Sequence, residues 1–184
     1  MRPFSQNTLS LAKVAGAASA TSDLSIAELE QIQISGITQS DSQVEPGDLF
    51  IAIAGSNSHG AEFAESAIGK GAVAVLTDSQ GAKLVKGAPV LIVSNPRYIA
   101  GVIAALFYNE PMRDLASVGI TGTNGKSTVS TLLYQIFEAA DRDCGLIGTI
   151  ETRIGKDSLA SSRTTPEATD LQALAATMRE RHMR

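Results

Sequence analysis

The residues with the clearest chemical meaning lie in the run from Val118 to Thr128, which reads VGITGTNGKST. Glycines let backbone N–H groups approach a phosphate closely, and a helix that begins directly after them adds a favourable dipole. Lys126 can reach the terminal phosphates of a nucleotide and act on them in catalysis, while Ser127 or Thr128 offers a hydroxyl to Mg²⁺. The run therefore predicts an ATP-binding loop made of Thr121, Gly122, Thr123, Asn124, Gly125, Lys126, Ser127 and Thr128.

The alternative for this run is a glycine-rich turn that only begins a helix. The general phosphate-loop pattern places a glycine five positions before Gly125, where this chain has Ile120. The flanking elements nevertheless favour a nucleotide loop. The apolar run 115–121 predicts a strand before it, and a one-face stripe predicts an amphipathic helix after it, made of Val129, Leu132, Leu133, Ile136, Phe137 and Ala140.

Three further polar segments could bind a ligand, although each also has a purely structural interpretation. Residues 40–52, SDSQVEPGDLFIA, form a turn whose hydroxyls could cap the backbone or hold a diphosphate or ribose. Residues 55–60, GSNSHG, predict a flexible loop in which His59 has no carboxylate partner in view, which favours a hydrogen-bonding role over a catalytic one. Thr164 and Thr165 could donate to a carboxylate or phosphate, or Thr165 could simply cap the helix that follows.

The elements that must position these residues alternate between strands and helices. Alternation over 32–37 predicts a half-buried strand, and three nearly continuous apolar runs predict buried strands at 49–54, 72–76 and 90–93. Helical spacing predicts helices over 61–69 and from Asn95-Pro96 to about residue 108. The pattern indicates an α/β protein.

The break at Asn109-Glu110-Pro111 predicts a domain boundary near residue 112. Residues 1–112 would then form a small N-terminal α/β domain, and residues 113–184 the start of a phosphate-loop domain with a mostly parallel sheet. In the second part we expect a strand at 144–147, an extended segment at 149–154, and a last helix with Thr165 as cap and Pro166 at its first position. Because doubly wound nucleotide domains usually need roughly 100–200 residues, this part looks truncated.

Composition argues against several classes of protein. The 184-residue chain has a net charge of −4, no Trp and only 4% aromatic residues, which disfavours a nucleic-acid partner. The single Cys144 excludes an internal disulfide and a cysteine-rich metal site. Apolar runs are too short to span a membrane, and Lys13 interrupts the one N-terminal segment with a signal-peptide character. We therefore expect a cytoplasmic protein without nucleic-acid or membrane partners that acts as a monomer.

The motifs themselves resemble one enzyme family. TGTNGKST at 121–128 is similar to the ATP loop of the Mur ligases and of their folylpolyglutamate synthetase relatives, and Ser127 directly after Lys126 favours the Mur side. Residues 40–52 resemble the N-terminal signature of the branch that forms the UDP-MurNAc tripeptide, which usually has Asp-Ser-Arg where this chain has Asp-Ser-Gln. GLIGT at 145–149 and TTPEA at 164–168 are close to the same branch.

The resemblance implies a reaction and a set of binding residues. It implies an ATP- and Mg²⁺-dependent ligase that adds diaminopimelate or L-lysine to UDP-MurNAc-L-Ala-D-Glu through an acyl phosphate. Lys126 would stabilise the transferring phosphoryl group, and Ser127 would bind Mg²⁺. The substrate would be contacted by Ser40, Ser42, Ser56, Asn57 and Ser58 at its UDP part, and by Thr164 and Thr165 at its muramoyl-dipeptide part. Gln43 in place of arginine removes a charge from the first of these loops.

Two other functions remain open from the sequence. The chain could belong to the D-glutamate-adding Mur ligases, although the segment at 40–52 and the Thr-Thr-Pro motif argue against this branch. It could also be a non-catalytic module that binds a UDP-sugar or a nucleotide. As a chain of this length we expect an incomplete or inactive ligase, and separate titrations with the UDP substrate and ATP would discriminate among these functions.

Overall fold

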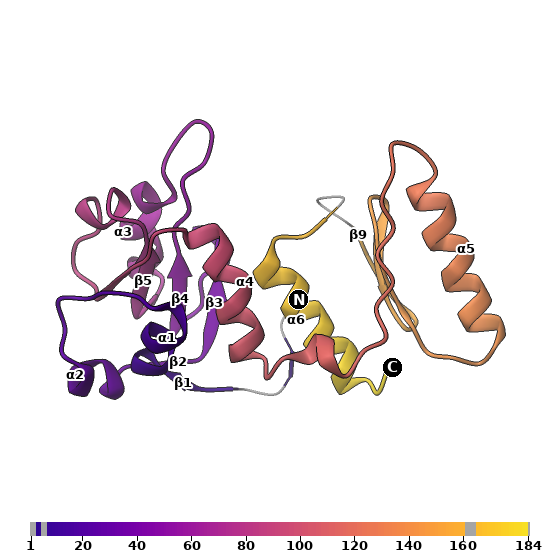
Figure 1. Cartoon of the computed structure of the whole chain (residues 1–184), viewed down its shortest axis with the longest axis horizontal. Coiled ribbons are helices and arrows are strands. Elements are labelled where there is room, and N and C mark those ends of the chain that lie inside the picture. The colour runs from indigo at the N-terminus through magenta and orange to yellow at the C-terminus, as the bar shows by residue number, and fades with distance from the viewer. Residues whose placement is uncertain (1–2, 5–6, 161–164, 184) are drawn as a thin grey trace. The chain divides into compact units, whose positions relative to one another are not determined.

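A computed structural model describes residues 3–4, 7–160 and 165–183 and divides into two compact units (Figure 1). The N-terminal unit comprises Ser5–Asn109. The C-terminal unit comprises Glu110–Arg184 together with Met1–Phe4. None of the helices in the described part of the chain is long and apolar enough to cross a membrane.

The N-terminal unit is built on a four-stranded parallel sheet in the order β3-β4-β5-β6. Its strands are β3 (Gly36–Thr38), β4 (Asp48–Ile51), β5 (Ala74–Thr77) and β6 (Val90–Ile92). Phe50 pairs with Val75 across the centre of the sheet. Every residue of β3, β4 and β5 is buried. Burial on both faces explains why β4 and β5 read as nearly continuous apolar runs, whereas β3, expected from its alternation to be half-buried, is fully buried.

Helices and short turns connect and cover these strands. They are α1 (Leu11–Ala18), α2 (Ile26–Gln31), α3 (Ala64–Gly69), α4 (Pro96–Phe107) and the 3-10 turns η1 (Asp41–Gln43), η2 (Gly60–Phe63) and η3 (Gly81–Lys83). Asn95 caps α4 and Pro96 occupies its first turn, as its sequence predicts. Ser25 and Glu28 form a capping box at α2.

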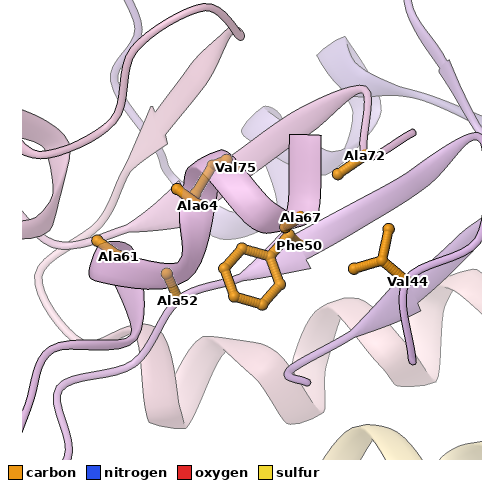
Figure 2. Packing of buried hydrophobic residues seen from close by; sticks show 8 residues of the cluster. All are labelled: Val44, Phe50, Ala52, Ala61, Ala64, Ala67, Ala72 and Val75. Carbon is orange, nitrogen blue, oxygen red and sulfur yellow. The ribbon is translucent and has the colours of Figure 1, made fainter. Parts of the chain in front are cut away.

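Small side chains let α3 and η2 pack closely on the sheet. Figure 2 shows the ring of Phe50 from β4 beside Ala52, Ala64 and Ala67, all of which are buried. Because alanine adds little bulk, the backbone of α3 can approach the sheet until the large ring fills the space between them. Truncating Phe50 to alanine would leave a cavity and cost about 3–5 kcal/mol.

The expected single strand over 32–37 is divided between two sheets. Gln33–Ile34 forms β2, which pairs antiparallel with β1 (Leu9–Ser10), whereas Gly36–Thr38 belongs to the parallel sheet. Ser35 lies between them, and its backbone N–H donates to the carbonyl of Gly47 at 2.9 Å. Tertiary hydrogen bonding at this one residue therefore redirects the chain, which periodicity alone does not reveal.

The C-terminal unit has a helix on its nucleotide-loop side and a small antiparallel sheet. Its elements are η4 (Pro111–Arg113), α5 (Lys126–Ala139), β7 (Gly145–Ile147), β8 (Glu151–Ile154), β9 (Asp157–Ala160) and α6 (Ala168–Glu180). The strand order is β7-β8-β9. Strand β9 was not expected, and it is joined to β8 by Gly155 and Lys156, with Gly155 in the left-handed conformation that tight hairpins require.

Two expectations for the C-terminal unit are wrong. Residues 115–121 are not a strand: they find no pairing partner among the described residues, and Val118 is 66% exposed. The sheet of this unit is antiparallel in its described part, because β7 pairs with β8 and β8 pairs with β9 in opposite directions. The α/β class itself is confirmed, and its parallel sheet lies in the N-terminal unit.

The start of the last helix also differs from the prediction. Glu167, not Thr165, occupies the N-cap of α6, so Pro166 lies before the helix rather than in its first turn. Glu167 has extended backbone angles (φ −61°, ψ 155°), and its carbonyl accepts the first helical hydrogen bond from the N–H of Leu171 at 2.9 Å. The helix therefore begins only at Ala168.

Candidate functional site

The turn before α5 has the backbone shape of an anion-binding loop. Gly125 is the N-cap of α5 with a φ of +81°, and Gly122 has a φ of +151°. Both angles suit glycine and disfavour other residues. No side chain in the described part of the chain caps α5, so N–H groups of its first turn remain available to a bound anion. The predicted helix after the loop is confirmed at Lys126–Ala139.

Lys126 lies directly on this loop. Its Nζ donates a hydrogen bond to the carbonyl oxygen of Gly122 at 2.7 Å. The ammonium group is thereby held next to the turn, where its hydrogen bond to the Gly122 carbonyl could be replaced by one to a phosphate oxygen. Charge-assisted hydrogen bonds of this kind are stronger than neutral ones.

A cavity of about 600 Å³ lies beside the loop, entirely within the C-terminal unit. Lys126, Ser127 and Thr165 line it together with apolar side chains such as Leu133 and Met178. The volume is within the range of ordinary ligand pockets, roughly 300–1,000 Å³. Thr121 also lines it, so the structure brings four predicted site residues to one cavity, whereas Thr123, Asn124 and Thr128 are exposed and do not line it.

The residues at this loop fit a phosphate-bound Mg²⁺ better than an all-protein metal centre. Within the described residues there is no cluster of His, Cys, Asp and Glu that could hold a metal ion. The half-buried Ser127 lies next to Lys126 in the first turn of α5. Mg²⁺ commonly takes one or two protein ligands and completes its shell with phosphate oxygens and water. Thr164 lies outside the described residues.

The predicted substrate residues of the N-terminal unit follow the carboxyl ends of its strands. Ser40 and Ser42 come after β3, Ser56 to Ser58 come after β4, and Asp78 comes directly after β5. Parallel strands end at the same edge of a sheet, and ligands of open α/β sheets bind in crevices at that edge. Figure 1 shows the loop after β4 extending beyond the end of the strand.

The loop after β3 is held by local hydrogen bonds and by one anchor on α3. The Oγ atoms of Ser40 and Ser42 lie 2.8 Å apart, and the N–H of Ser40 donates to Thr38 Oγ1 at 3.1 Å. Asp41 provides the anchor, because its Oδ2 accepts from Ser66 Oγ at 3.0 Å and its carbonyl from Lys70 Nζ at 2.9 Å. Two adjacent hydroxyls are therefore presented on a fixed turn.

The loop after β4 presents its polar side chains outward. The N–H of Gly55 donates to the carbonyl of Ser58, and the N–H of Gly60 donates to the carbonyl of Ile53, each at 3.0 Å. Ser56, Asn57 and Ser58 are all exposed. The backbone thus closes the loop at its base and leaves these three side chains accessible to a ligand.

Asp78 is a residue of this edge that sequence reasoning missed. His59 Nε2 lies 3.2 Å from Asp78 Oδ2, and His59 Nδ1 accepts from the N–H of Ala61 at 3.0 Å. Because Nδ1 accepts, Nε2 carries the proton and donates to Asp78. The sequence analysis found no carboxylate partner for His59, and this is wrong. Asp78, at the end of the neighbouring strand β5, is that partner.

The electrostatics of Asp78 favour its charged form. The N–H of Gly81 donates to Asp78 Oδ1 at 2.8 Å and the N–H of Gln80 at 2.9 Å. The bond from Gly81 is the largest influence and, with those from His59 and Gln80, holds the pKa of Asp78 below its usual value, although burial opposes them. The sequence signal that could have revealed the His59–Asp78 pair is that two neighbouring parallel strands, β4 and β5, end at the same edge of the sheet.

In comparisons with known proteins, both units match models of the same protein family. The family model described as "Mur ligase family, catalytic domain" matches residues 33–108, and the model described as "Mur ligase middle domain" matches residues 120–184. Together these two matches leave out residues 1–32 and the connection at residues 109–119.

Curated relatives and a solved structure agree with the family models. The chain is 48% identical over 182 residues to a Streptomyces avermitilis protein named UDP-N-acetylmuramoyl-L-alanyl-D-glutamate--2,6-diaminopimelate ligase, which covers 98% of this chain and 35% of that protein. A protein of the same name from Streptomyces coelicolor is 51% identical over 151 residues, or 81% of this chain and 30% of the relative. A solved structure titled with that enzyme name matches with a TM-score of 0.66 at 22% identity, over 94% of this chain and 34% of the other. The chain therefore spans about a third of the length of the relatives it matches.

Proposed function

Because the chain belongs to the Mur ligase family, we propose that it provides the UDP-substrate unit and part of the ATP-binding unit of a ligase of peptidoglycan precursor synthesis. The reaction is the ATP-dependent addition of the third amino acid to UDP-MurNAc-L-Ala-D-Glu. The observation that carries this proposal is the pairing of two features. One is the set of hydroxyl-bearing loops at the carboxyl edge of a parallel sheet, and the other is an uncapped, glycine-shaped loop with Lys126 at its mouth.

The N-terminal unit binds the uridine diphosphate part of the substrate in this proposal. Ser40 and Ser42 offer neighbouring hydroxyls, and Ser56, Asn57 and Ser58 offer exposed polar groups at the same edge. Support comes from the position of these loops, since ligands of open parallel sheets bind where the strands end. Gln43 stands in the exposed turn η1 and contributes a neutral side chain there.

The C-terminal unit binds the phosphates of ATP. The N–H groups at the start of α5 hold phosphate oxygens, and Lys126 stabilises negative charge on the transferring phosphoryl group. Mg²⁺, when bound, neutralises charge between the phosphates, and Ser127 is its proposed protein ligand. The substrate carboxylate attacks the γ-phosphorus of ATP, which releases ADP and leaves an acyl phosphate. The amine of the incoming amino acid then displaces inorganic phosphate, loses a proton and forms the amide bond. Thr164 and Thr165 hold the muramoyl-dipeptide, with Thr165 at the cavity that also contains Lys126.

The third amino acid is 2,6-diaminopimelate in this proposal. The names of the two Streptomyces relatives support it over L-lysine. The enzyme is proposed to work as a monomer in the cytoplasm, where its nucleotide substrates are available.

A second candidate function is a module that binds the UDP substrate without turnover. It is favoured by residues 115–120, which precede the ATP loop and form no strand within the described chain. A nucleotide loop that lacks a paired strand behind it is held less firmly than one inside a complete sheet.

Separate titrations decide between these functions. UDP-MurNAc-L-Ala-D-Glu and Mg-ATP are each titrated into the 184-residue protein by calorimetry, and formation of UDP-MurNAc-tripeptide is assayed with 2,6-diaminopimelate. Binding of both ligands supports the ligase units. Binding of the UDP substrate alone supports the module. Preference for UDP-MurNAc-L-Ala would favour a D-glutamate-adding ligase, and binding of neither ligand would refute the proposal.

A further inference from the structure

The loop that carries Ser56, Asn57 and Ser58 depends on its base for its shape. Ala54 and His59 pair as an antiparallel bridge, and the N–H of Gly55 donates to the carbonyl of Ser58. The side chains between these anchors are exposed. Whatever fixes residue 59 therefore fixes the direction in which the loop projects.

The side chain of His59 fixes this base in two directions. Nδ1 accepts the N–H of Ala61, which ties the ring to the start of η2. Nε2 donates to Asp78, which ties the same ring to the end of β5. The His59 side chain is only 13% exposed, so water competes little for either hydrogen bond. One ring thus links the loop after β4 to the loop after β5.

The surroundings of Asp78 are shaped to receive this ring. The N–H groups of Gln80 and Gly81 both donate to Asp78 Oδ1, and His59 Nε2 lies 3.3 Å from Oδ1 and 3.2 Å from Oδ2, so the carboxylate is held in place with both oxygens beside the ring. Gly81 also provides space, because a Cβ there would overlap with Cε1 of His59 and with Oγ1 of Thr77. Both the orientation of the acceptor and the room for the ring are therefore present at one turn.

We propose that His59 and Asp78 are positioning residues that hold the loop 54–59 in the conformation that receives a uridine diphosphate. The ligand in this statement rests on the proposed function above, whereas the ordering of the loop does not. Neither side chain needs to touch the ligand. A loop that is ordered before binding loses less conformational entropy when it binds, so the pair raises affinity through preorganisation.

Binding of free UDP to the 184-residue protein tests the consequence for affinity. Asn at position 59 can still accept from the N–H of Ala61 but is too short to reach Asp78, so His59→Asn removes only the link between the loops. We expect His59→Asn and Asp78→Asn each to raise the Kd for UDP about tenfold, measured by calorimetry, with the affinity for Mg-ATP unchanged. Equal UDP affinity in wild type and both variants would overturn the proposal.

Ser25→Ala is the matched control for a general loss of stability. It breaks the capping box of α2 in the same unit, and Figure 1 shows α2 far from the loop that follows β4. We expect it to lower the melting temperature of the N-terminal unit without changing the Kd for UDP. If Ser25→Ala weakened UDP binding as much as His59→Asn, the positioning role would be refuted.

Amide hydrogen exchange without ligand tests the ordering itself. The amides of Gly55 and Gly60 close the loop, whereas the amide of Ala52 donates to Leu76 inside the sheet. In His59→Asn we expect exchange at the two glycines to become roughly tenfold faster relative to Ala52. If exchange at Gly55 and Gly60 were unchanged in both His59→Asn and Asp78→Asn, the proposal would be overturned even if the protein binds UDP. If wild type binds no UDP, the proposed function fails, and the exchange rates still decide the ordering.

Discussion

Lys126 donates a hydrogen bond from its Nζ to the carbonyl oxygen of Gly122 at 2.7 Å, so the first residue of α5 reaches back across the turn that precedes it. The ammonium and the open N-terminus of α5 are thereby directed at one place. Two independent sources of positive potential, one a formal charge and one a helix dipole, converge there. The proposed phosphate-binding role of this loop rests on that arrangement, and the first prediction tests it.

Replacing the Lys126 ammonium should weaken ATP binding selectively. Hydrogen bonds to charged groups contribute about 1.5–3 kcal/mol, so Lys126→Gln is expected to raise the Kd for Mg-ATP by roughly 10- to 150-fold. Calorimetric titration provides the measurement, with UDP binding as an internal reference that should not change. Lys156→Gln, which removes the same charge from the exposed β8–β9 turn, is the matched control. Equal ATP affinity in Lys126→Gln and wild type would contradict the role assigned to this side chain.

Gly125 is required for its backbone angle rather than for space. A Cβ at Gly125 would meet nothing within 4 Å, but its φ of +81° is unfavourable for other residues. Gly125→Ala should therefore destabilise the first turn of α5 by about 1–2 kcal/mol. Gly119→Ala is the matched control, because Gly119 also has open space around it but no positive φ. Hydrogen exchange of α5 amides should accelerate only in Gly125→Ala, and equal acceleration in both variants would refute the explanation.

The parts of the fold that sequence reasoning predicted are those that burial or a local helix cap determines. Strands β4 and β5 appear as apolar runs because all of their residues are buried, and Asn95 and Pro96 indicate the start of α4. Residues 115–121 have the same apolar character, yet they form no strand in the described structure. A hydrophobic run indicates that a segment can be buried, but it does not indicate whether a neighbouring strand is present to pair with it.

The site was predicted where a motif is contiguous and missed where two loops meet. The loop 121–128 is continuous in the chain, so its residue types and the helix after it were enough to predict a nucleotide loop there. Asp78 follows an ordinary apolar strand and gains its meaning only because β4 and β5 are neighbours in the sheet. Likewise, β9 was missed because Asp157–Ala160 has little apolar character, and only the turn at Gly155 indicates a hairpin.

Lys70 should affect UDP binding through the loop after β3. Its Nζ donates to the carbonyl of Asp41 at 2.9 Å and lies 3.5 Å from the carboxylate of the same residue. Exposed contacts of this kind contribute about 0.2–1 kcal/mol, so Lys70→Met is expected to raise the Kd for UDP by no more than about fivefold. Lys13→Met, on the exposed face of α1, makes the same chemical change away from the loop. A larger effect of Lys13→Met than of Lys70→Met would contradict the anchoring role of Asp41.

Asp78 should make the stability of the N-terminal unit depend on acid pH. Its pKa is lowered in the folded protein, chiefly by the N–H of Gly81, so its carboxylate stabilises the fold above the ordinary aspartate pKa. That stabilisation is lost as pH falls from about 4 through the lower folded pKa. Asp78→Asn cannot titrate and should therefore lose less stability between pH 5 and strongly acidic pH, roughly pH 2–3, in urea unfolding.

His59→Asn provides the discriminating comparison for this pH dependence. It removes the hydrogen bond from the ring to Asp78 but retains those from Gln80 and Gly81. Because the Gly81 bond is the largest cause of the lowered pKa, His59→Asn should keep most of the acid-dependent loss of stability. If His59→Asn flattened the pH dependence as fully as Asp78→Asn, the backbone N–H groups would not be the main stabilisers of the Asp78 carboxylate, and the ring of His59 would have to take that role.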